Sequence, residues 1–584
     1  MLVYGDQEEP AAVSAKLRAI REDLARVWEM APGLERHSAL VSTLIEGGRL
    51  QQGIADACFD GLDRRSRAGQ ALGGFVHRLA KAVVLSWDSE GADVGALPEV
   101  PDLAGPPVEA MLRLPEGFAF YAVYPEAFID AARALTLTAP ARVIGIRSVG
   151  TTLGAVVSAA LGAPPPVTVR PFGDPWARQV ALSGELEAAT LEGPAHYVIV
   201  DEGPGLSGSS FGSVIDWLRE RGVPLDRIAV LPSHLGAPGP SASKAHRDQW
   251  RQVQRVPADL ASRLPDLLEQ RLADVLGPLD GPVIDLAAGR WRRWAFAGES
   301  QWPPVDAALE RRKYLAFANG ENWLVKFAGL GAEGARKAEI GRRLSQARLT
   351  PETRALVHGF LVERWHGDAV REQPPVDVVA RYIGARARAL RDCGGAGASL
   401  RELLEMAEQN YGEAGLEAPI ARWRDRVAAL EPRVRRIATD NRMMWWEWLR
   451  LPSGEWLKSD ALDHHRAHDL VGCQDMAWDV AGAIVEMSLD AGQAEQLCSR
   501  VERFASVAPD PELLRFYLLA YPAFCIGQIH FADRASGGAE KRRVAARAEQ
   551  LVRSFHRLAA ARESSESAIN SLSGTNRRGN NPDY

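Results

Sequence analysis

The chain has 584 residues, a mass of 63.5 kDa and 46% hydrophobic residues. It is too long for one ordinary hydrophobic core, and we expect about three domains. Its formal net charge of -6 and mean hydropathy of -0.17 exclude the chain-wide basic field that non-specific nucleic-acid binding needs. The five scattered cysteines have no metal-ligand spacing and indicate reduced thiols.

No run of the sequence reaches the roughly 18 apolar residues of a membrane span, and the N-terminal segment carries charges where a signal peptide needs its apolar core. We therefore expect a soluble, cytoplasmic protein. Its partners should be small molecules, with neither nucleic acid nor a membrane among them. The oligomeric state is left open, and a homodimer is one alternative.

The first 92 residues have apolar positions at helical spacing, as in LRAIREDLARVWEM and LGGFVHRLAKAVVLSW. The segment 1–92 is therefore predicted to be a helical N-terminal region. Prolines and glycines then break the periodicity and mark a linker near 89–107.

Over 108–260 the pattern changes to short β-rich runs that alternate with helices, among them RVIGIRSVG, VTVRPFG, HYVIVDEG and RIAVLPS. This alternation predicts an α/β domain with a mainly parallel sheet. The fold class is thus α/β and multidomain, with N-terminal helices, this parallel sheet, and an α+β part that follows.

The α+β part, over 280–560, opens with turn- and strand-like text and continues as long helices with one clear hairpin, MMWWEWLRLPSGEWLKSD. The polar segment 561–584 has few apolar residues and is predicted to be a disordered tail.

An apolar run that ends in two acids and a loop of small residues is the first candidate site. YVIVDEGPGLSGSSF occupies residues 197–211, with Asp201 and Glu202 where the run ends. Ligands bind at the carboxyl ends of strands in α/β sheets, where a following loop and helix present backbone N–H groups. The loop 207–210 would cradle a monophosphate, and the two acids would hold a sugar diol or a hydrated Mg²⁺. Taken alone, the stretch is equally explained by a strand end and a capped helix.

A second stretch with the same form lies upstream. RVIGIRSVGTTLGAVVSAAL, residues 142–161, is again an apolar run, a tight loop and a helix, with Arg147 in the loop. Between the two stretches, VTVRPFGDPWAR supplies Arg170 and Arg178. A loop with free amides and nearby guanidinium groups is suited to binding diphosphate.

Together these stretches resemble the phosphoribosyl diphosphate motif and the diphosphate loop of type I phosphoribosyltransferases, over about 110–255. The resemblance implies transfer from phosphoribosyl diphosphate with Mg²⁺, and it assigns catalytic roles to Asp201, Glu202 and Arg147. The spacer GPGL is one residue longer than the family's usual three. The residues implied to bind phosphoribosyl diphosphate are Arg147, Ser148, Val149, Gly150, Thr151, Arg170, Arg178, Asp201, Glu202, Ser207, Gly208, Ser209 and Ser210.

The α+β part carries the second candidate site. Lys326 lies in an apolar predicted strand, and a lysine buried there requires a negative partner. Glu339 follows on a predicted helix. Farther along, Asp440 precedes the hairpin and Asp460 ends its second strand. The tripeptide HGD at 366–368 lies too close to Lys326 to be a catalytic loop.

This arrangement resembles aminoglycoside phosphotransferases and related kinase-like proteins over about 285–530, where one Asp orients the acceptor hydroxyl and a second Asp after a hairpin binds Mg²⁺. Asp475 and Asp479 in GCQDMAWDVAGA match a helix start of that family. The resemblance implies Asp440 as the catalytic residue. The residues implied to bind ATP are Lys326, Glu339 and Asp460, and those implied to bind the metal are Asp460 and Asn441.

The family's metal-binding Asn is replaced by Trp445 in this chain. Asn441, Glu447 and Asp463 are candidates to take its place, and a degenerate kinase is the alternative. Two segments, AAGRWRRW and FANGEN, are candidates for the nucleotide loop. The histidines 464, 465 and 468 are predicted to lie in a solvated turn rather than at a metal.

The two sites favour a bifunctional transferase. One half would use phosphoribosyl diphosphate, and the other would phosphorylate a small metabolite with ATP. The acceptor of each transfer is open. The alternative is a sensor or regulatory protein that binds a phosphoribosyl ligand or nucleotide and contains a degenerate kinase module.

Overall fold

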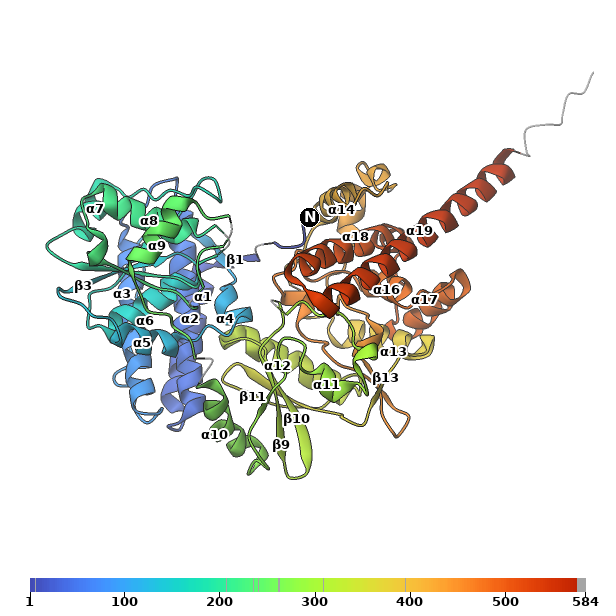
Figure 1. Ribbon diagram of the computed structural model, residues 1–584, viewed down its shortest axis with the longest axis horizontal. Helices are drawn as coiled ribbons and strands as arrows, with labels where there is room; N and C mark the ends of the chain where they lie inside the picture. The colour runs from blue at the N-terminus through green and yellow to red at the C-terminus, as the bar shows by residue number, and fades with distance from the viewer. Residues whose placement is uncertain are drawn as a thin grey trace, which may run out of the picture.

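A computed structural model of the chain divides into two halves, one built from residues up to about 280 and the other mainly from those that follow (Figure 1). The side chains of 558–574 and the whole of 575–584 lie outside the described residues. Within the rest of the chain, the residues not described are Asp6, Leu206, Leu235, Pro240, Ala261, Ser262, Ala308, Gly394 and Ala418.

The first half contains a five-stranded sheet of order β4-β3-β5-β6-β7, in which every neighbouring pair is parallel. All residues of β5 are buried, as expected for a strand covered on both faces. The order reverses between β3 and β5, so the loops after these two strands diverge and leave a crevice. The strands are β3 (Ala141–Ile146), β4 (Val167–Val169), β5 (His196–Val200), β6 (Ile228–Leu231) and β7 (Gln254–Arg255).

Helices cover both faces of this sheet (Figure 1). Gly150 lets α6 approach β5 closely, because a Cβ there would lie 2.5 Å from the carbonyl oxygen of Val200. The helices of the sheet region are α4 (Glu116–Phe120), α5 (Pro125–Arg133), α6 (Val149–Ala160), α7 (Gly184–Thr190), α8 (Ser209–Glu220) and α9 (Lys244–Gln252). The next helix, α10 (Leu264–Leu276), lies beside the sheet of the second half (Figure 1).

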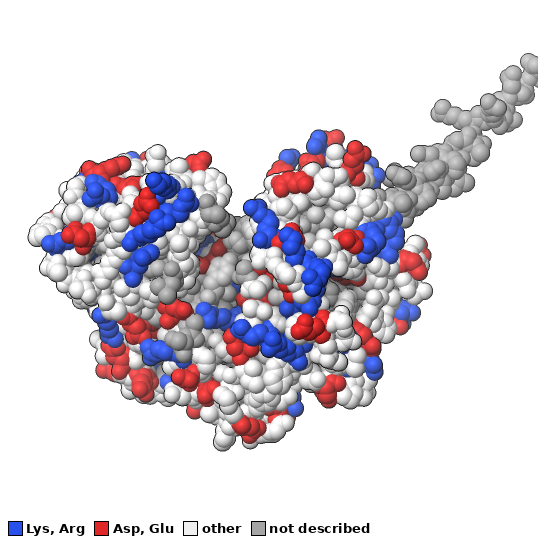
Figure 2. Space-filling view, viewed as in Figure 1, with Lys and Arg blue, Asp and Glu red and all other residues white. Residues whose placement is uncertain are grey.

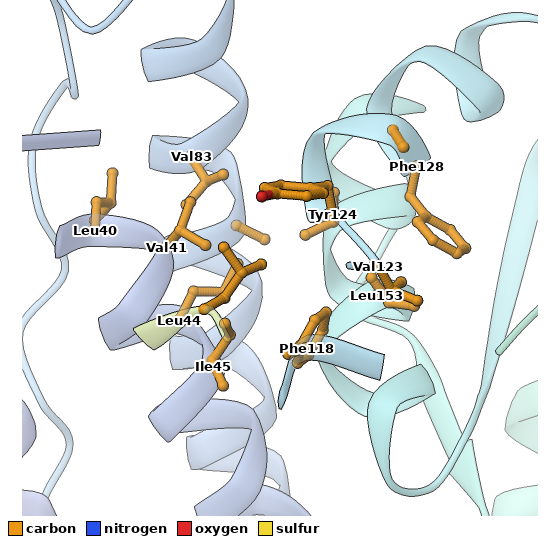
Figure 3. Packing of buried hydrophobic residues seen from close by; sticks show 14 of the residues in the cluster. Leu40, Val41, Leu44, Ile45, Val83, Phe118, Val123, Tyr124, Phe128 and Leu153 are labelled. Carbon is orange, nitrogen blue, oxygen red and sulfur yellow. The ribbon is translucent and has the colours of Figure 1, made fainter. Parts of the chain in front are cut away.

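The N-terminal helices pack directly on the sheet region and share its hydrophobic core. Figure 3 shows Leu44 and Ile45 of α2 facing Phe118, with Leu153 of α6 behind it. The predicted helical region also includes a strand, because β1 (Glu8–Ala12) pairs antiparallel with β2 (Glu109–Arg113). The helices are α1 (Val13–Glu29), α2 (Leu34–Ala57) and α3 (Arg67–Asp88).

The second half begins with an antiparallel sheet of order β11-β12-β10-β9-β8, flanked by α12 (Gly331–Gln346). The predicted strands around Lys326 and at 357–365 are present as two hairpins. RWRRW, part of the candidate nucleotide loop AAGRWRRW, forms a turn and the short helix α11 (Arg292–Ala295). The strands are β8 (Ile284–Asp285), β9 (Lys313–Ala318), β10 (Glu321–Phe327), β11 (Thr353–Val357) and β12 (Phe360–Arg364).

A helical lobe follows this sheet and contains the predicted hairpin, which pairs with a further short strand. Asp510 caps α18 by accepting two backbone N–H bonds, and Asp475 caps α16. Its strands are β13 (Val370–Arg371), β14 (Trp448–Arg450) and β15 (Trp456–Lys458). Its helices are α13 (Val376–Ala389), α14 (Leu400–Glu413), α15 (Val427–Leu430), α16 (Met476–Glu486), α17 (Ala491–Ala505), α18 (Pro511–Ala535) and α19 (Gly538–Gly574).

The two halves are joined by hydrogen bonds and by a shared apolar core. The N–H of Leu330 donates to the carbonyl oxygen of Phe118 at 2.9 Å, and the Tyr124 hydroxyl donates to that of His358 at 2.9 Å. The first five residues cross to the helical lobe, where Val3 is buried against α18 (Figure 1). The relative placement of the halves is therefore fixed by packing at several points.

The C-terminal helix extends farther than the sequence suggests. A disordered tail is predicted from residue 561, whereas α19 continues to Gly574. The last part of the predicted tail, 575–584, lies outside the described residues. Among the described residues, no helix combines the length and apolar content needed to cross a membrane.

Candidate functional site

Two cavities contain the candidate residues. The first, called the sheet cavity, has a volume of about 630 Å³ and is lined by residues that follow the carboxyl ends of all five parallel strands. The second, called the cleft cavity, has a volume of about 320 Å³ and lies between the antiparallel sheet and the helical lobe. On the face shown in Figure 2 the surface is hollowed between the two halves, and acidic and basic side chains are interspersed.

The two predicted acids line the sheet cavity side by side. Burial raises the pKa of Asp201 to about 7, although backbone N–H donors, among them that of Gly150, act to lower it. Burial also raises the pKa of Glu202 well above its ordinary value, and the neighbouring charges of Asp201 and Glu116 add to the rise. Carboxylates held in this way favour a bound cation or hydroxyl donors, because either would relieve their repulsion.

The loop before α6 has a strained backbone at the cavity wall. Ser148 has φ 123°, a left-handed value that is costly for a residue with a Cβ. Ser148 and Val149 line the cavity, as expected, whereas Thr151 is buried within α6 and, among the described residues, is not part of the lining.

Arg147 and Arg170 were expected to face a diphosphate, and the structure engages both with acids instead. The Arg147 guanidinium lies 2.9 Å from Asp56 and 2.6 Å from Asp63. Arg170 donates to Asp56 at 2.9 Å through Nε. Both acids come from the segment that ends α2, which sequence patterns did not connect to the sheet. The two arginines border the cavity but are largely neutralised there.

Of the predicted phosphate loop, Ser210 lines the cavity, and Arg178 donates to its hydroxyl at 2.8 Å. The hydroxyls of Ser207 and Ser209 lie 2.9 Å apart, and Ser209 donates to the carbonyl oxygen of Pro175 at 2.7 Å. Gly208, with φ 60°, makes the left-handed turn into α8. The hydroxyls at 207 and 209 are thus engaged within the protein, with each other and with Pro175.

In the cleft cavity, Lys326 forms ion pairs with Asp460 and Asp463. Burial opposes the charge of Lys326, but the two carboxylates raise its pKa above the ordinary value. Lys337 of α12 lies 2.9 Å from Asp463 and holds that carboxylate from the other side. The strand lysine thus meets the negative partner that its burial requires.

A cluster of two acids and one histidine also lines this part of the cavity. Single donor atoms of Glu447, Asp460 and His464 all lie within 4.8 Å of one another. Burial raises the pKa of Glu447 to about 7, and the charges of Asp460 and Asp440 add to the rise. The histidine segment is therefore not a solvated turn: His464 belongs to this group and His465 is fully buried.

Asp440 does not face the cleft cavity, although the sequence pattern assigned it the catalytic role. Its side chain is fully buried and accepts a hydrogen bond from the Tyr382 hydroxyl. The Lys458 ammonium lies 3.3 Å from Asp440 and 2.7 Å from Glu447. Lys458 thus lies between the two acids, and Glu447 rather than Asp440 lines the cavity.

Two more of the expected residues lie away from the cavity. Glu339 is on the exposed side of α12 and pairs with Arg342 and Arg343. Asn441 donates to the carbonyl oxygens of His464 and Gly472 at 3.2 and 2.8 Å, so it supports the loop instead of presenting its amide. These positions do not support their assignment to ATP and to metal.

The Asp479 carboxylate has a structural role beneath this site. It accepts the backbone N–H bonds of Asp440 and Asn441, each at 2.9 Å.

The candidate loop FANGEN forms the tip of the β9–β10 hairpin, away from the described lining, whereas Trp291 of AAGRWRRW lines the cavity.

Aromatic and cationic groups complete the cleft cavity. Arg371 is half-buried, with its guanidinium 5.6 Å from the Trp291 ring centre and 5.8 Å from that of Trp365. Burial lowers the pKa of Arg371 to about 10. Arg442 also lines the cavity and lies 3.3 Å from Asp469. Sequence patterns singled out Trp291, within AAGRWRRW, but not Trp365, Arg371 or Arg442, which come from loops and strand ends without a motif.

The two cavities share a wall. Tyr121 lines both of them. Next to it, Glu116 of the sheet cavity lies 2.6 Å from the imidazole of His468, which lines the cleft cavity. Arg311 lines the cleft cavity and the adjacent Arg312 lines the sheet cavity. A short basic segment therefore runs from one cavity to the other.

Comparison with known proteins gives matches only to solved structures. No model of a protein family matches the chain, and no curated protein does. A choline kinase from Streptococcus pneumoniae is 14% identical, with a TM-score of 0.32 over 50% of this chain and 99% of that one. A choline/ethanolamine kinase family protein from Mesorhizobium loti is 16% identical, with a TM-score of 0.29 over 51% and 98%. A type I macrolide 2′-phosphotransferase is 15% identical, with a TM-score of 0.31 over 48% and 95%. At these TM-scores the matches do not establish a function for this chain.

Proposed function

We propose that the second half of the chain is a phosphotransferase that moves the terminal phosphoryl group of ATP to a hydroxyl of a small molecule. The observation that carries this proposal is the meeting of Lys326, Asp460 and Glu447 on the wall of one cavity between a small sheet and a helical lobe. Phosphoryl transfer depends mainly on positioning and on neutralising charge, and these groups supply both.

Each group has a distinct role in this proposal. Asp460 and Glu447 would bind Mg²⁺, since two carboxylates together with phosphate oxygens form a suitable ligand set. Lys326 would contact the phosphates, with Asp463 and Lys337 holding it in place. The aromatic part of the lining, around Trp291 and Trp365, suits a planar base.

Asp440 is not assigned to the acceptor, because it lies behind Lys458. We assign the acceptor side instead to Arg442 and Asp469, which line the cavity as a pair. Binding of MgATP measured by calorimetry tests the site. Lys326→Met and Asp460→Asn should each abolish detectable binding. Glu339→Gln is the matched control, and it should bind like the unaltered chain because Glu339 points to solvent. Binding that is unaffected by Asp460→Asn would rule the assignment out.

A second function is favoured by the sheet cavity. We propose that it binds phosphoribosyl diphosphate and transfers the phosphoribosyl group, because its acids and its phosphate loop meet at the reversal of strand order. Asp201 and Glu202 would face the ribose hydroxyls or Mg²⁺, and Arg178 and Ser210 the 5′-phosphate. Of the other assigned residues, Ser148 and Val149 would meet the diphosphate through backbone amides.

Calorimetry with phosphoribosyl diphosphate and Mg²⁺ tests this second proposal. Asp201→Asn with Glu202→Gln should remove binding, while Glu185→Gln, on the exposed surface of α7, should leave it unchanged. Release of diphosphate in the presence of acceptor mixtures would support transfer. Binding without any release would instead favour the alternative of a sensor for a phosphoribosyl ligand.

The shared wall supports successive use of the two cavities. A phosphate-bearing product of one site would meet Arg311 and Arg312 on its way to the other, with Tyr121 between them. In this proposal the two transfers act on one metabolite. Purified chain supplied with both donors and an acceptor mixture should yield a product that carries both a phosphoribosyl group and an added phosphate.

A further inference from the structure

A buried cluster of two histidines and one glutamate lies where the two halves meet. His37 comes from α2, Glu126 from α5, and His358 from the turn between β11 and β12. The Nε2 atoms of His37 and His358 lie 2.8 and 3.0 Å from the same oxygen, Glu126 Oε1. None of the three is among the described residues that line either cavity. The cluster is therefore separate from both proposed sites.

A serine hydroxyl at Nδ1 fixes the orientation of each imidazole. His37 Nδ1 lies 2.9 Å from the Ser86 hydroxyl, and His358 Nδ1 lies 2.8 Å from the Ser38 hydroxyl. His358 has φ 41°, and the Tyr124 hydroxyl donates to its carbonyl oxygen at 2.9 Å. Polar partners on the outer nitrogen are the usual means by which proteins aim the other nitrogen at a metal ion.

The charge at the centre of this cluster needs a counterpart. The side chain of Glu126 is 1% exposed, and its Oε2 has no hydrogen-bond partner among the described residues. Its Oε1 contacts the two imidazoles, and the ring of Trp87 lies 5.8 Å from that of His37. A buried carboxylate requires positive charge nearby, which either a proton on one imidazole or a metal ion would supply.

We propose that this cluster is a structural zinc site that joins the two halves. The donors are two imidazole nitrogens and a carboxylate, a set that suits Zn²⁺, and single donor atoms of the three residues lie within 4.8 Å of one another. The unpartnered Glu126 Oε2 supplies a further donor. The ion would connect α2 and α5 to the β11–β12 turn and so hold the shared wall of the cavities. This site does not depend on the proposed activities.

Zinc content and thermal stability of the full chain test the site. Protein from zinc-supplemented culture, washed by gel filtration, should hold about one zinc ion per chain, and its Tm should fall when a strong chelator removes the ion. His37→Gln and His358→Gln should each lose the zinc. The matched control is His77→Gln, another buried histidine of the N-terminal helices, which should keep it.

A variant that keeps all three ligands guards against loss of folding. Ser38→Ala removes the partner of His358 Nδ1 and should weaken zinc binding by about 10- to 100-fold without unfolding the chain. Cobalt(II) should replace zinc and give the visible absorption of a tetrahedral complex in the unaltered chain but not in His358→Gln. Zinc-free protein whose Tm is indifferent to added zinc and to chelator would overturn the proposal, and a proton would then hold the cluster together.

Discussion

Replacing Asp440 by Asn separates a structural role from a catalytic one. The carboxylate is fully buried, with the Lys458 ammonium at 3.3 Å and the Arg386 guanidinium at 3.9 Å. Breaking a buried ion pair costs about 3–5 kcal/mol. Because Glu447 still lies 2.7 Å from Lys458, we expect the lower end, about 3 kcal/mol. For a unit of this size that corresponds to a Tm lower by roughly 6 °C.

The Kd for MgATP should change in Asp460→Asn and not in Asp440→Asn, the reverse of the effect on Tm. Asp440 is outside the cavity lining, so Asp440→Asn should leave the Kd for MgATP within about threefold. Asp460→Asn should raise that Kd by at least about 100-fold, or 2.7 kcal/mol, because it removes a proposed metal ligand. Its Tm should change little, since Lys326 keeps its partner Asp463.

Differential scanning fluorimetry and calorimetry on the two variants give both quantities. An Asp440→Asn variant that melts like the unaltered chain and yet loses MgATP binding would refute the structural role assigned to Asp440. Such a result would mean that Asp440 reaches the nucleotide directly and that Lys458 does not separate it from the cavity.

Four further predictions concern the sheet cavity and the metal. Burial raises the pKa of Asp201 from its ordinary 3.8 to about 7, so the folded chain binds more protons than the unfolded chain between these values. Stability should therefore fall as pH rises across that window, and Asp201→Asn should flatten the dependence of Tm on pH. Binding of phosphoribosyl diphosphate with Mg²⁺ should strengthen over the same rise and level off above about pH 7, because binding favours the charged carboxylate. Gly150→Ala should lower Tm by several degrees, since its Cβ would meet a carbonyl oxygen at 2.5 Å, while Gly184→Ala, with open space around it, should not. Removal of Mg²⁺ with EDTA should abolish calorimetric binding of ATP, and binding that persists would contradict the roles of Asp460 and Glu447.

Much of the local structure follows from sequence patterns. An apolar run such as 196–200, ended by acids and a glycine-rich loop, favours a buried strand, and the structure has β5 there and α8 after the loop. The hairpin with the turn PSG and the cap at Asp475 are likewise local features. They depend on residues close together in the chain, so their signals survive in the sequence.

The composition of the cleft site was only partly predictable. Lys326 was identified because it occupies a strand, and Asp460 because it follows the second strand of the hairpin. Glu447 was only one of several candidates, since its approach to Asp460 depends on how the hairpin is placed. Asp440 has a convincing position in the sequence, but packing of Tyr382 and Lys458 turns it inward.

Local sequence patterns indicate where strands end and which chemical groups follow them: two acids and a serine loop in one half, a strand lysine and a hairpin aspartate in the other. Which of these groups face a cavity depends on how the elements pack together. Asp56 and Asp63 neutralise Arg147 from a distant helix end, and the two halves meet along Tyr121. Such pairings depend on how elements far apart in the chain pack together, and the pattern of neighbouring residues does not indicate that packing.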